Sequence, residues 1–335
     1  MSDLSPIWTE HAHGWLQVKI PLPFSLKWVN SYLLPGDAGW TMIDPGLRTE
    51  EAIACWDSVL DQVGIDWSGI SSIVVTHHHP DHYGLAGLAQ MRSGAPIWMS
   101  QTAMKTARRL WGKDETFSAE LTEAFVKHGL PSELEQSMLE HMTGFRRRCR
   151  LGPERPDIRI LEPGTEFKMA GAIWEIIGGE GHAPGHVSLL DRRRRLLLCG
   201  DQVLPQITPN IGWMPGGDPD PLGSYLQTLR SMLGLPVDIA FPGHRDPFSR
   251  FDERVLEIAA HHDRRLSHML ELVGDGSIST FELCEATFGA RLRGNIHNLR
   301  FALAETIAHA VYLEKSGKLI RAADFDGSII RFRKA

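Results

Sequence analysis

The residues best suited to chemistry lie in one short segment, directly after an apolar run that predicts a β-strand. The segment reads Thr76-His77-His78-His79-Pro80-Asp81-His82. His77 and His79 are two residues apart, so their rings point the same way if the chain is extended there. Asp81 and His82 follow Pro80, whose missing N–H is no loss at the start of a helix. Two ligands on a loop and two at a helix start can face one point. Imidazole with carboxylate suits zinc, iron or manganese rather than calcium. The alternative is a polar loop that is rich in histidine by chance.

Four further motifs accompany this segment, each at a predicted turn or strand end. They are Leu33-Leu34 through Met42-Ile43-Asp44-Pro45-Gly46, Gly181-His182-Ala183-Pro184-Gly185-His186, Leu198-Cys199-Gly200-Asp201 and Phe241-Pro242-Gly243-His244. In this order the five motifs resemble those of the metallo-β-lactamase-fold hydrolases, which include glyoxalase II-type thioesterases, lactonases and β-lactamase-like ribonucleases. The resemblance implies an α/β fold, the αββα sandwich. It does not specify a substrate, because members of one fold cleave very different bonds.

The resemblance also implies a binuclear site with two Zn²⁺ ions per chain, or with iron or manganese in their place. The implied ligands are His77, His79, His182 and Asp201 at the first metal, and Asp81, His82, His244 and Asp201 at the second. Asp201 would bridge the ions with one oxygen to each. His186 would order its loop rather than bind metal. Iron-dependent persulfide oxidation in related enzymes uses a subset of these ligands, so ligand identity alone leaves that chemistry open.

Other residues near the motifs are candidates for roles in hydrolysis. A water held by zinc loses a proton near neutral pH and becomes a nucleophile. Asp81 would accept a hydrogen bond from that nucleophile, and Tyr83 would donate to a substrate oxygen, as a tyrosine does in lactonase-like relatives. Asp44 closes a predicted strand and either supports a ligating histidine or is a turn residue. Cys199 on a strand is expected to be buried and inert.

Composition narrows the class of protein. The 335 residues suffice for one or two domains, and 42% hydrophobic and 23% charged residues are ordinary for a globular chain. A net charge of -6 gives no general attraction to nucleic acid or to an anionic membrane. The four scattered cysteines fit a reducing compartment. Because the first residues resemble no signal peptide and no apolar run could span a bilayer, we expect a cytoplasmic enzyme that acts on a small molecule.

The hydrophobic pattern divides the chain into three parts. We expect a catalytic domain over 1–250, with a helical insertion at 101–157, and a small winged-helix-like domain over 251–335. The insertion would cover the metal cleft or make a homodimer contact. Its apolar residues would line a substrate pocket or form ordinary core: Trp111, Phe117, Phe125, Met138 and Phe145.

Several polar features have two interpretations. The arginines at 146–148, with those at 150, 155 and 159, would grip a carboxylate or phosphate, or would form a solvated helix end, which we favour. The arginines at 192–195 predict a solvated hairpin turn. His128 and His141 lack ligand-like spacing. The loop 202–215 is a natural substrate wall, with Trp213 and Met214 facing an acyl group.

The C-terminal part is expected to contain helices at 254–273, 280–288 and 296–316 and then a hairpin with its turn at 324–327. Residues 254–335 contain 12 Lys/Arg against 10 Asp/Glu, counted along the sequence. Because a reading helix with Glu305 and Glu314 would bind phosphates poorly, nucleic acid is not the expected partner. Packing or dimerisation is the expected role.

We therefore expect a zinc hydrolase that cleaves a thioester, ester or lactone of a small acyl compound, with a glyoxalase II-like thioesterase as the leading form. No basic motif matches glutathione binding, which weakens that one substrate. The alternative is a β-lactamase-like endoribonuclease or phosphodiesterase. A third hypothesis is a non-enzymatic binding or regulatory protein that the metals stabilise.

Overall fold

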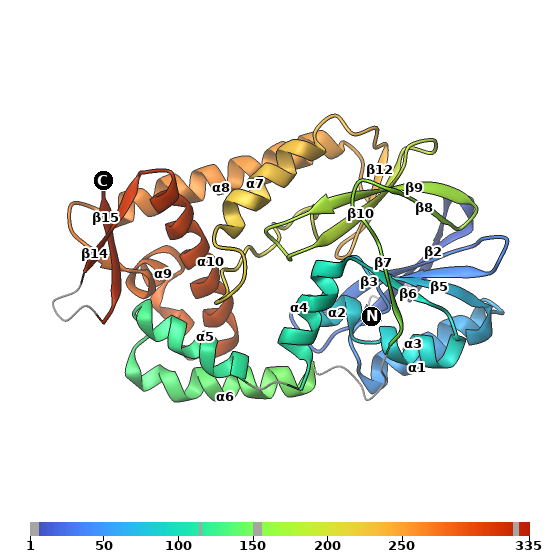
Figure 1. Cartoon of the computed structure of the whole chain (residues 1–335), viewed down its shortest axis with the longest axis horizontal. Coiled ribbons are helices and arrows are strands. Elements are labelled where there is room, and N and C mark those ends of the chain that lie inside the picture. Colours follow the sequence, from blue (N-terminus) through green and yellow to red (C-terminus); the bar gives the residue numbers. More distant parts are fainter. Residues whose placement is uncertain (1–6, 114–115, 150–155, 324–327) are drawn as a thin grey trace, which may run out of the picture.

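Two mixed β-sheets form the centre of the computed structural model, which describes residues 7–113, 116–149, 156–323 and 328–335 (Figure 1). The first sheet contains β1 (Trp8–His11), β2 (Trp15–Pro21), β3 (Trp28–Leu34), β4 (Trp40–Ile43), β5 (Ile70–Val74), β6 (Ile97–Met99) and β7 (Ile158–Ile160), in that order. The second has the order β12 (Ile239–Pro242), β11 (Leu196–Gly200), β10 (His186–Asp191), β9 (Ala172–Gly179) and β8 (Glu166–Met169). Strands β4 to β7 run parallel and β1 to β4 antiparallel.

Helices cover both outer faces of this pair of sheets and build the rest of the molecule. In chain order they are α1 (Glu50–Gln62), α2 (Pro80–Tyr83), α3 (Ala86–Ser93), α4 (Gln101–Trp111), α5 (Thr116–Lys127), α6 (Ser132–Arg148), α7 (Pro221–Met232), α8 (Phe251–Val273), α9 (Thr280–Phe288) and α10 (Ile296–Lys315). The predicted start of α1 is confirmed, because Thr49 Oγ1 accepts a hydrogen bond from Ala52 N at 3.1 Å. None of the helices in the described ranges is both long and apolar enough to cross a membrane.

The alternation of side chains along each strand produces the layers. On β3, Leu33 packs into the core that includes α1, whereas Tyr32 and Leu34 pack into the core between the sheets. On β11, Leu197 packs into the core that includes α7 and α8, whereas Leu198 faces the first sheet. The result is the expected order of helix, sheet, sheet and helix, which confirms the predicted sandwich.

The helices α4 to α6 form the insertion that the sequence predicts. Its five candidate pocket residues are all buried, with exposed fractions from 0% to 7%, and share one core with α10. The core interpretation is therefore confirmed. Ser100 caps α4, since its Oγ accepts a hydrogen bond from Ala103 N at 3.1 Å, whereas Pro131 occupies the position before α6 and provides no such cap.

The arginine run at the end of α6 differs from the solvated helix end that we favoured. Arg146 is 7% exposed and its Nε donates to the carbonyl of Leu110 at 2.7 Å. Arg147 and Arg148 are exposed. The expectations for residues 150 and 155 lie outside the described ranges.

The C-terminal elements surround a small sheet with the order β13 (Ile278–Ser279), β15 (Ile330–Lys334) and β14 (Leu319–Ala323). The predicted turn at 324–327 lies outside the described residues. Helix α10 packs against both α6 and α7 (Figure 1), and the residues of α8, α10, β14 and β15 share one core with α7. The C-terminal elements are thus continuous with the packing of the catalytic part.

Replacing Trp174 with alanine is expected to lower the free energy of unfolding by about 3–5 kcal/mol. The Trp174 side chain is fully buried between the sheets, where its ring lies 5.5 Å from that of Trp15. Chemical denaturation measures the change. The neighbouring Ile173 is 52% exposed, so Ile173→Ala should change stability by no more than about 0.5 kcal/mol. Equal losses in the two variants would contradict the assigned core.

Candidate metal centre

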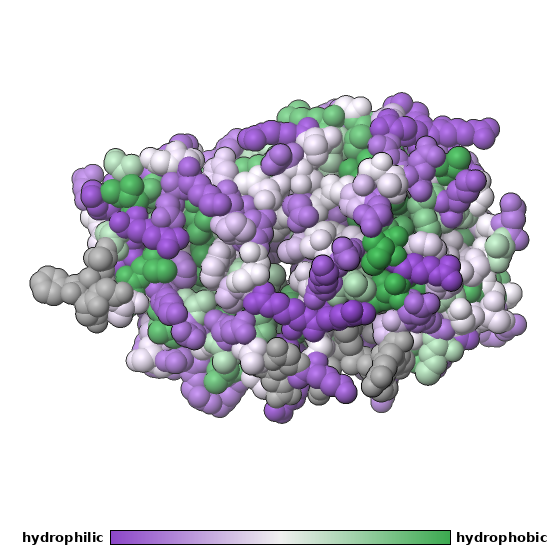
Figure 2. All heavy atoms as spheres, in the orientation of Figure 1, coloured by the Kyte–Doolittle hydropathy of each residue, from purple (hydrophilic) through white to green (hydrophobic). Residues whose placement is uncertain are grey.

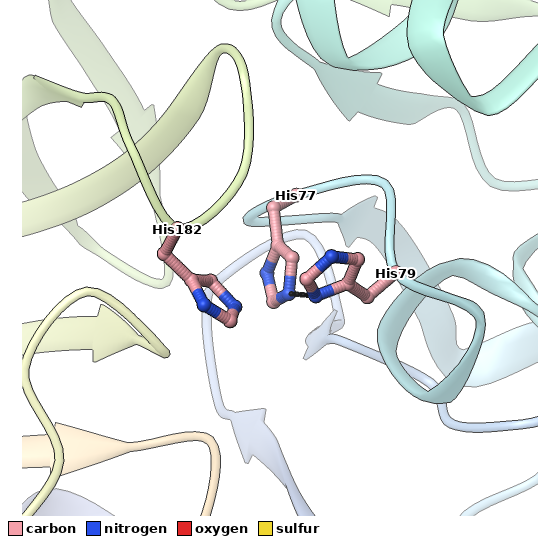
Figure 3. A group of neighbouring side chains, drawn as sticks. All are labelled: His77, His79 and His182. Atoms are coloured by element: carbon pink, nitrogen blue, oxygen red, sulfur yellow. Dashed lines mark hydrogen bonds between the residues drawn. The ribbon is translucent and has the colours of Figure 1, made fainter. Parts of the chain in front are cut away.

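The loop after β5 brings His77 and His79 toward His182, which lies in the loop after β9 (Figure 3). Nε2 of His77 lies 3.0 Å from Nδ1 of His79. One ring nitrogen from each of the three histidines lies within 4.8 Å of the others. A glycine is required next to His182, because Gly181 has a φ of +92° and a Cβ there would lie 2.3 Å from Cβ of Tyr225. The ligands predicted for the first metal therefore converge.

A second group converges beside the first. Asp81 and His82 lie on α2, and His244 follows β12, yet one ligand atom from each lies within 4.8 Å of the others. The Oδ2 atom of Asp81 is 3.4 Å from Nε2 of His244 and 4.0 Å from Nε2 of His82. Pro80 occupies the first position of α2, as the sequence predicts.

Asp201 joins the two groups through a single oxygen. Its Oδ2 atom lies 3.4 Å from Nε2 of both His82 and His244, and 3.7 Å from Nε2 of His182. Its Oδ1 atom is turned toward Gly243, where a Cβ would approach it to 2.2 Å. The expectation that each oxygen serves one metal therefore differs from the observed orientation, in which Oδ2 faces members of both groups.

His77 and His79 have the charge state that metal ligands require, whereas His244 must lose a proton before it can bind a cation. Burial, together with the neighbouring histidines, holds the pKa values of His77 and His79 well below the usual range, so both imidazoles are neutral. Burial would also lower the pKa of His244, but the carboxylates of Asp201 and Asp81 raise it to about 10. Conversely, the facing histidines hold the pKa of Asp201 well below its usual range despite burial. Neutral imidazoles and ionised carboxylates are the forms that bind a cation.

Among the candidate ligands, two buried ring nitrogens lack a hydrogen-bond partner within the described ranges, Nε2 of His82 and Nε2 of His182. Both face Oδ2 of Asp201 at 3.4 Å and 3.7 Å without hydrogen-bond geometry. Buried polar atoms without partners are costly, and a shared cation would satisfy them. The seven candidate ligand residues offer imidazole nitrogens and carboxylate oxygens, and this set of donors fits one or two transition-metal ions.

Asp44 supports the site from behind. Its oxygens accept hydrogen bonds from the backbone N and the hydroxyl of Thr76, both at 2.7 Å, and Oδ2 accepts one from Nδ1 of His82 at 2.9 Å. Its φ of +49° also makes it a turn residue, so both interpretations of Asp44 hold. Because its oxygens are occupied, Asp44 orients a ligand rather than acting as one.

Two histidines are anchored by backbone groups. Nδ1 of His244 lies 3.1 Å from the carbonyl of Trp28, which leaves its Nε2 for the site. His186 is fully buried, and its Nε2 accepts a hydrogen bond from the backbone N of Asp201 at 3.2 Å. The loop-ordering role predicted for His186 agrees with this contact.

The C-terminal elements reach the site through a chain of hydrogen bonds that the sequence did not reveal. Nδ1 of His182 lies 3.0 Å from the carbonyl of Asn210. The side-chain amide of Asn210 donates to Glu305 of α10 at 2.7 Å, and Glu305 forms an ion pair with Arg265 of α8. The backbone N of Trp213 also donates to the carbonyl of Ala304 at 3.0 Å. Helix α10 therefore holds the loop that orients a candidate ligand.

Replacing Asn210 with alanine is expected to weaken metal binding about tenfold. The variant keeps the carbonyl that faces His182 but loses the side-chain bond to Glu305 that positions this carbonyl, and disturbed support of a ligating histidine typically costs about 10–100-fold. Titration of the protein against a chromophoric chelator measures the affinity. Asn298→Ala is the matched control, since Asn298 is exposed on α10. Unchanged metal affinity in Asn210→Ala would show that the relay has no influence on His182.

The remaining candidates lie away from the converging groups. Tyr83 is 3% exposed and packs in the core under the first sheet, where burial raises its pKa to about 12. Its contact with substrate stays a prediction, and its burial argues against it. Cys199 is fully buried, and burial raises the pKa of its thiol, as expected for an inert residue. Trp213 and Met214 are half-buried in the loop, and their role in a substrate wall also stays a prediction.

Comparison with known proteins places this geometry in context. Residues 29–244 match the family model of the metallo-beta-lactamase superfamily, and residues 266–335 match that of the metallo-beta-lactamase-like C-terminal domain. The chain is 24% identical over 330 residues to the probable metallo-hydrolase YqjP of Bacillus subtilis (strain 168), which covers 95% of this chain and 97% of that protein. A crystal structure of a metallo-beta-lactamase family protein from Thermus thermophilus matches with a TM-score of 0.82 and 30% identity, covering 96% of this chain and 99% of that one.

Two relatives have names that specify a reaction. Hydroxyacylglutathione hydrolase GloC of Haemophilus influenzae is 26% identical over 198 residues, which is 59% of this chain and 76% of that protein. An atrochrysone carboxyl ACP thioesterase of Aspergillus fumigatus is 22% identical over 295 residues, which is 84% of this chain and 75% of that protein.

Proposed function

Because this chain belongs to the metallo-beta-lactamase superfamily, we propose that it is a binuclear zinc hydrolase that cleaves a thioester, ester or lactone of a small acyl compound. The observation that carries the proposal is the position of Asp201 Oδ2, between three histidine nitrogens that belong to two ligand groups. The ligands would be His77, His79, His182 and Asp201 for one ion, and Asp81, His82, His244 and Asp201 for the other.

The bound ions would supply an activated water and a Lewis acid at the attacked carbonyl. Residues of the chain would accept the proton and hold the ligands in position. Asp81 has a side chain that is 22% exposed, compared with 7% for Asp201, so it is the carboxylate of the site that meets solvent. It can accept the proton that a nucleophilic water loses. Asp44 and the carbonyls of Trp28 and Asn210 hold the imidazoles in place while charge develops.

A thioester is the leading substrate class. The names of the two relatives above specify thioester hydrolysis, and thioesters need no phosphate-binding groove.

The ribonuclease alternative is less favoured because Glu305 and Glu314 on α10 would repel nucleic acid. In the structure Glu305 pairs with Arg265, and Glu314 pairs with Arg321, so these charges are partly neutralised. The winged-helix assignment, the cytoplasmic location, the absence of a nucleic-acid partner and homodimer formation all stay predictions.

A hydrolysis panel tests the proposal. The zinc-loaded protein is assayed with S-lactoylglutathione, acyl-CoA, homoserine lactone, nitrocefin, bis-p-nitrophenyl phosphate and single-stranded RNA. We expect thioester turnover that a chelator abolishes and that added zinc restores. RNA turnover at a rate comparable to that of thioesters would reverse the ranking. Bound metal without any turnover would favour the non-enzymatic hypothesis.

A further inference from the structure

Arg300 on α10 forms no ion pair with a carboxylate of the described residues. Its guanidinium carbon lies 4.5 Å from the ring centre of Phe145 and 3.9 Å from that of Phe301, so two aromatic rings hold it. Its Nε and Nη2 atoms are buried and have no hydrogen-bond partner in the described residues. Burial lowers the pKa of Arg300 to about 10, which still leaves it charged at neutral pH. The Arg300 side chain as a whole is half-buried, but buried donor atoms without a partner are costly unless a ligand satisfies them.

The histidines around Arg300 do not balance its charge, because lowered pKa values keep both of them neutral. His141 and His297 lie close together, with ring centres 5.4 Å apart. Burial, then Arg300 and then Arg148 lower the pKa of His297, and the same groups act on His141, whose pKa falls to about 4. Neither Arg300 nor Arg148 forms an ion pair with any carboxylate in the part of the chain that the structure describes. Arg148 lies one helical turn after Phe145 on α6, and Arg300 contacts the ring of Phe145, so the two arginines lie near one another in one region.

Apolar rings form the walls of this region. Phe24, from the loop between β2 and β3, stacks on His297 at 5.9 Å and lies 6.0 Å from Phe145. Phe301 is 39% exposed, so the region reaches solvent. In the face shown in Figure 2, hydrophilic side chains in purple are interspersed with smaller groups of hydrophobic ones in green.

The same region adjoins the candidate metal centre. Cys149, one turn after Phe145, is buried in the same core, and its backbone N donates to the carbonyl of Phe145 at 3.0 Å. Phe145 also lies 6.1 Å from the ring of Trp111. The indole N–H of Trp111 donates to the carbonyl of His78, between two candidate ligands, at 2.9 Å.

We infer that Arg300 and Arg148 form a subsite for an anionic group of the substrate, a carboxylate or a phosphate, and that Phe24 and Phe301 hold the apolar part beside it. The inference rests on the proposed function, because it specifies which acyl compounds the metal centre meets. The negatively charged group of the substrate would lie at a distance from the bond that is cleaved. Guanidinium groups suit this task, because they donate paired hydrogen bonds to carboxylates and phosphates.

Binding of thioether analogues, which are not hydrolysed and have no free thiol, tests the subsite by calorimetry with the zinc-loaded protein. The probes are S-methyl-CoA, which carries phosphates, S-methylglutathione, which carries carboxylates, and neutral S-methylpantetheine. We expect at least one anionic probe to bind at least tenfold more tightly than the neutral probe. Arg300→Met should abolish this advantage and Arg300→Lys should restore part of it. Tighter binding of S-methyl-CoA alone assigns a phosphate, and tighter binding of S-methylglutathione alone assigns a carboxylate.

The matched control is Arg147→Gln, which removes an exposed arginine one residue before Arg148 and should keep the advantage. If Arg300→Met does not fold, Arg148→Gln carries the test, because Arg148 is exposed. The subsite is overturned if the anionic and neutral probes bind equally well, or if the arginine variants keep the advantage. Calorimetry needs no turnover, so a failure of the hydrolysis panel leaves this test intact. Thioester hydrolysis without an anion preference would overturn the subsite alone.

Discussion

Asp201→Ala is expected to lose hydrolytic activity by roughly 10³-fold or more, which corresponds to about 4 kcal/mol of transition-state stabilisation, and to lose most of its bound metal. The physical reason is the position of Oδ2, 3.4 Å from the nitrogens of His82 and His244 and 3.7 Å from that of His182. Without this carboxylate the two sets of ligands lose the oxygen that faces both of them. Metal analysis of the purified variant and its rate in the hydrolysis assay measure the two losses.

Asp191 provides the matched control for this substitution. It is a buried aspartate on the same pair of strands, at the end of β10, where it pairs with Arg194. Asp191→Asn should keep its metal and its activity even if it lowers stability. Full metal content in Asp201→Ala would mean that the carboxylate is not a ligand.

Asp44→Ala is expected to have the second largest effect, a 10–100-fold weaker affinity for metal and a lower stability. The substitution removes the acceptor of three buried donors, two on Thr76 and one on His82. Each donor left unpaired costs about 1–3 kcal/mol. The φ of +49° adds strain for alanine, whereas asparagine tolerates that conformation. Thermal unfolding with and without zinc separates the loss of stability from the loss of metal.

Asp44→Asn separates the two roles of this residue. It keeps the backbone conformation but replaces one acceptor oxygen with an N–H₂ group that faces a donor. We expect most of the loss in metal affinity with a smaller loss of stability than in Asp44→Ala. If Asp44→Asn bound metal as tightly as the wild-type protein, the support of His82 by a carboxylate would be disproved.

The parts of the structure that the sequence predicted well depend on local signals. Alternating apolar residues predicted β2 and β3, and the capping threonine predicted α1. The order of five short motifs predicted which distant residues would converge, because the motifs follow strands of the two packed sheets and their residues meet at one site between them. Strands β1, β6 and β8 have four residues or fewer and were missed, since such short runs carry too little periodicity.

The features that the sequence did not reveal depend on contacts between distant elements. The residue pattern around Asp201 does not predict that Oδ2 faces the site while Gly243 leaves room for Oδ1. Glu305 was interpreted as a surface charge on a helix, but its partners Arg265 and Asn210 come from other elements. Arg146 was assigned to a solvated helix end, but the carbonyl of Leu110 holds it in the interior. Such pairings are set by tertiary packing.

Anomalous diffraction at the zinc absorption edge, from crystals of the zinc-loaded protein, tests the central claim most directly. We predict two peaks about 3.5–4 Å apart, one on each side of Asp201, with His77, His79 and His182 around one and Asp81, His82 and His244 around the other. The absence of peaks at this position, or a single ion that leaves one of the two ligand groups empty, would contradict the paired metal centre.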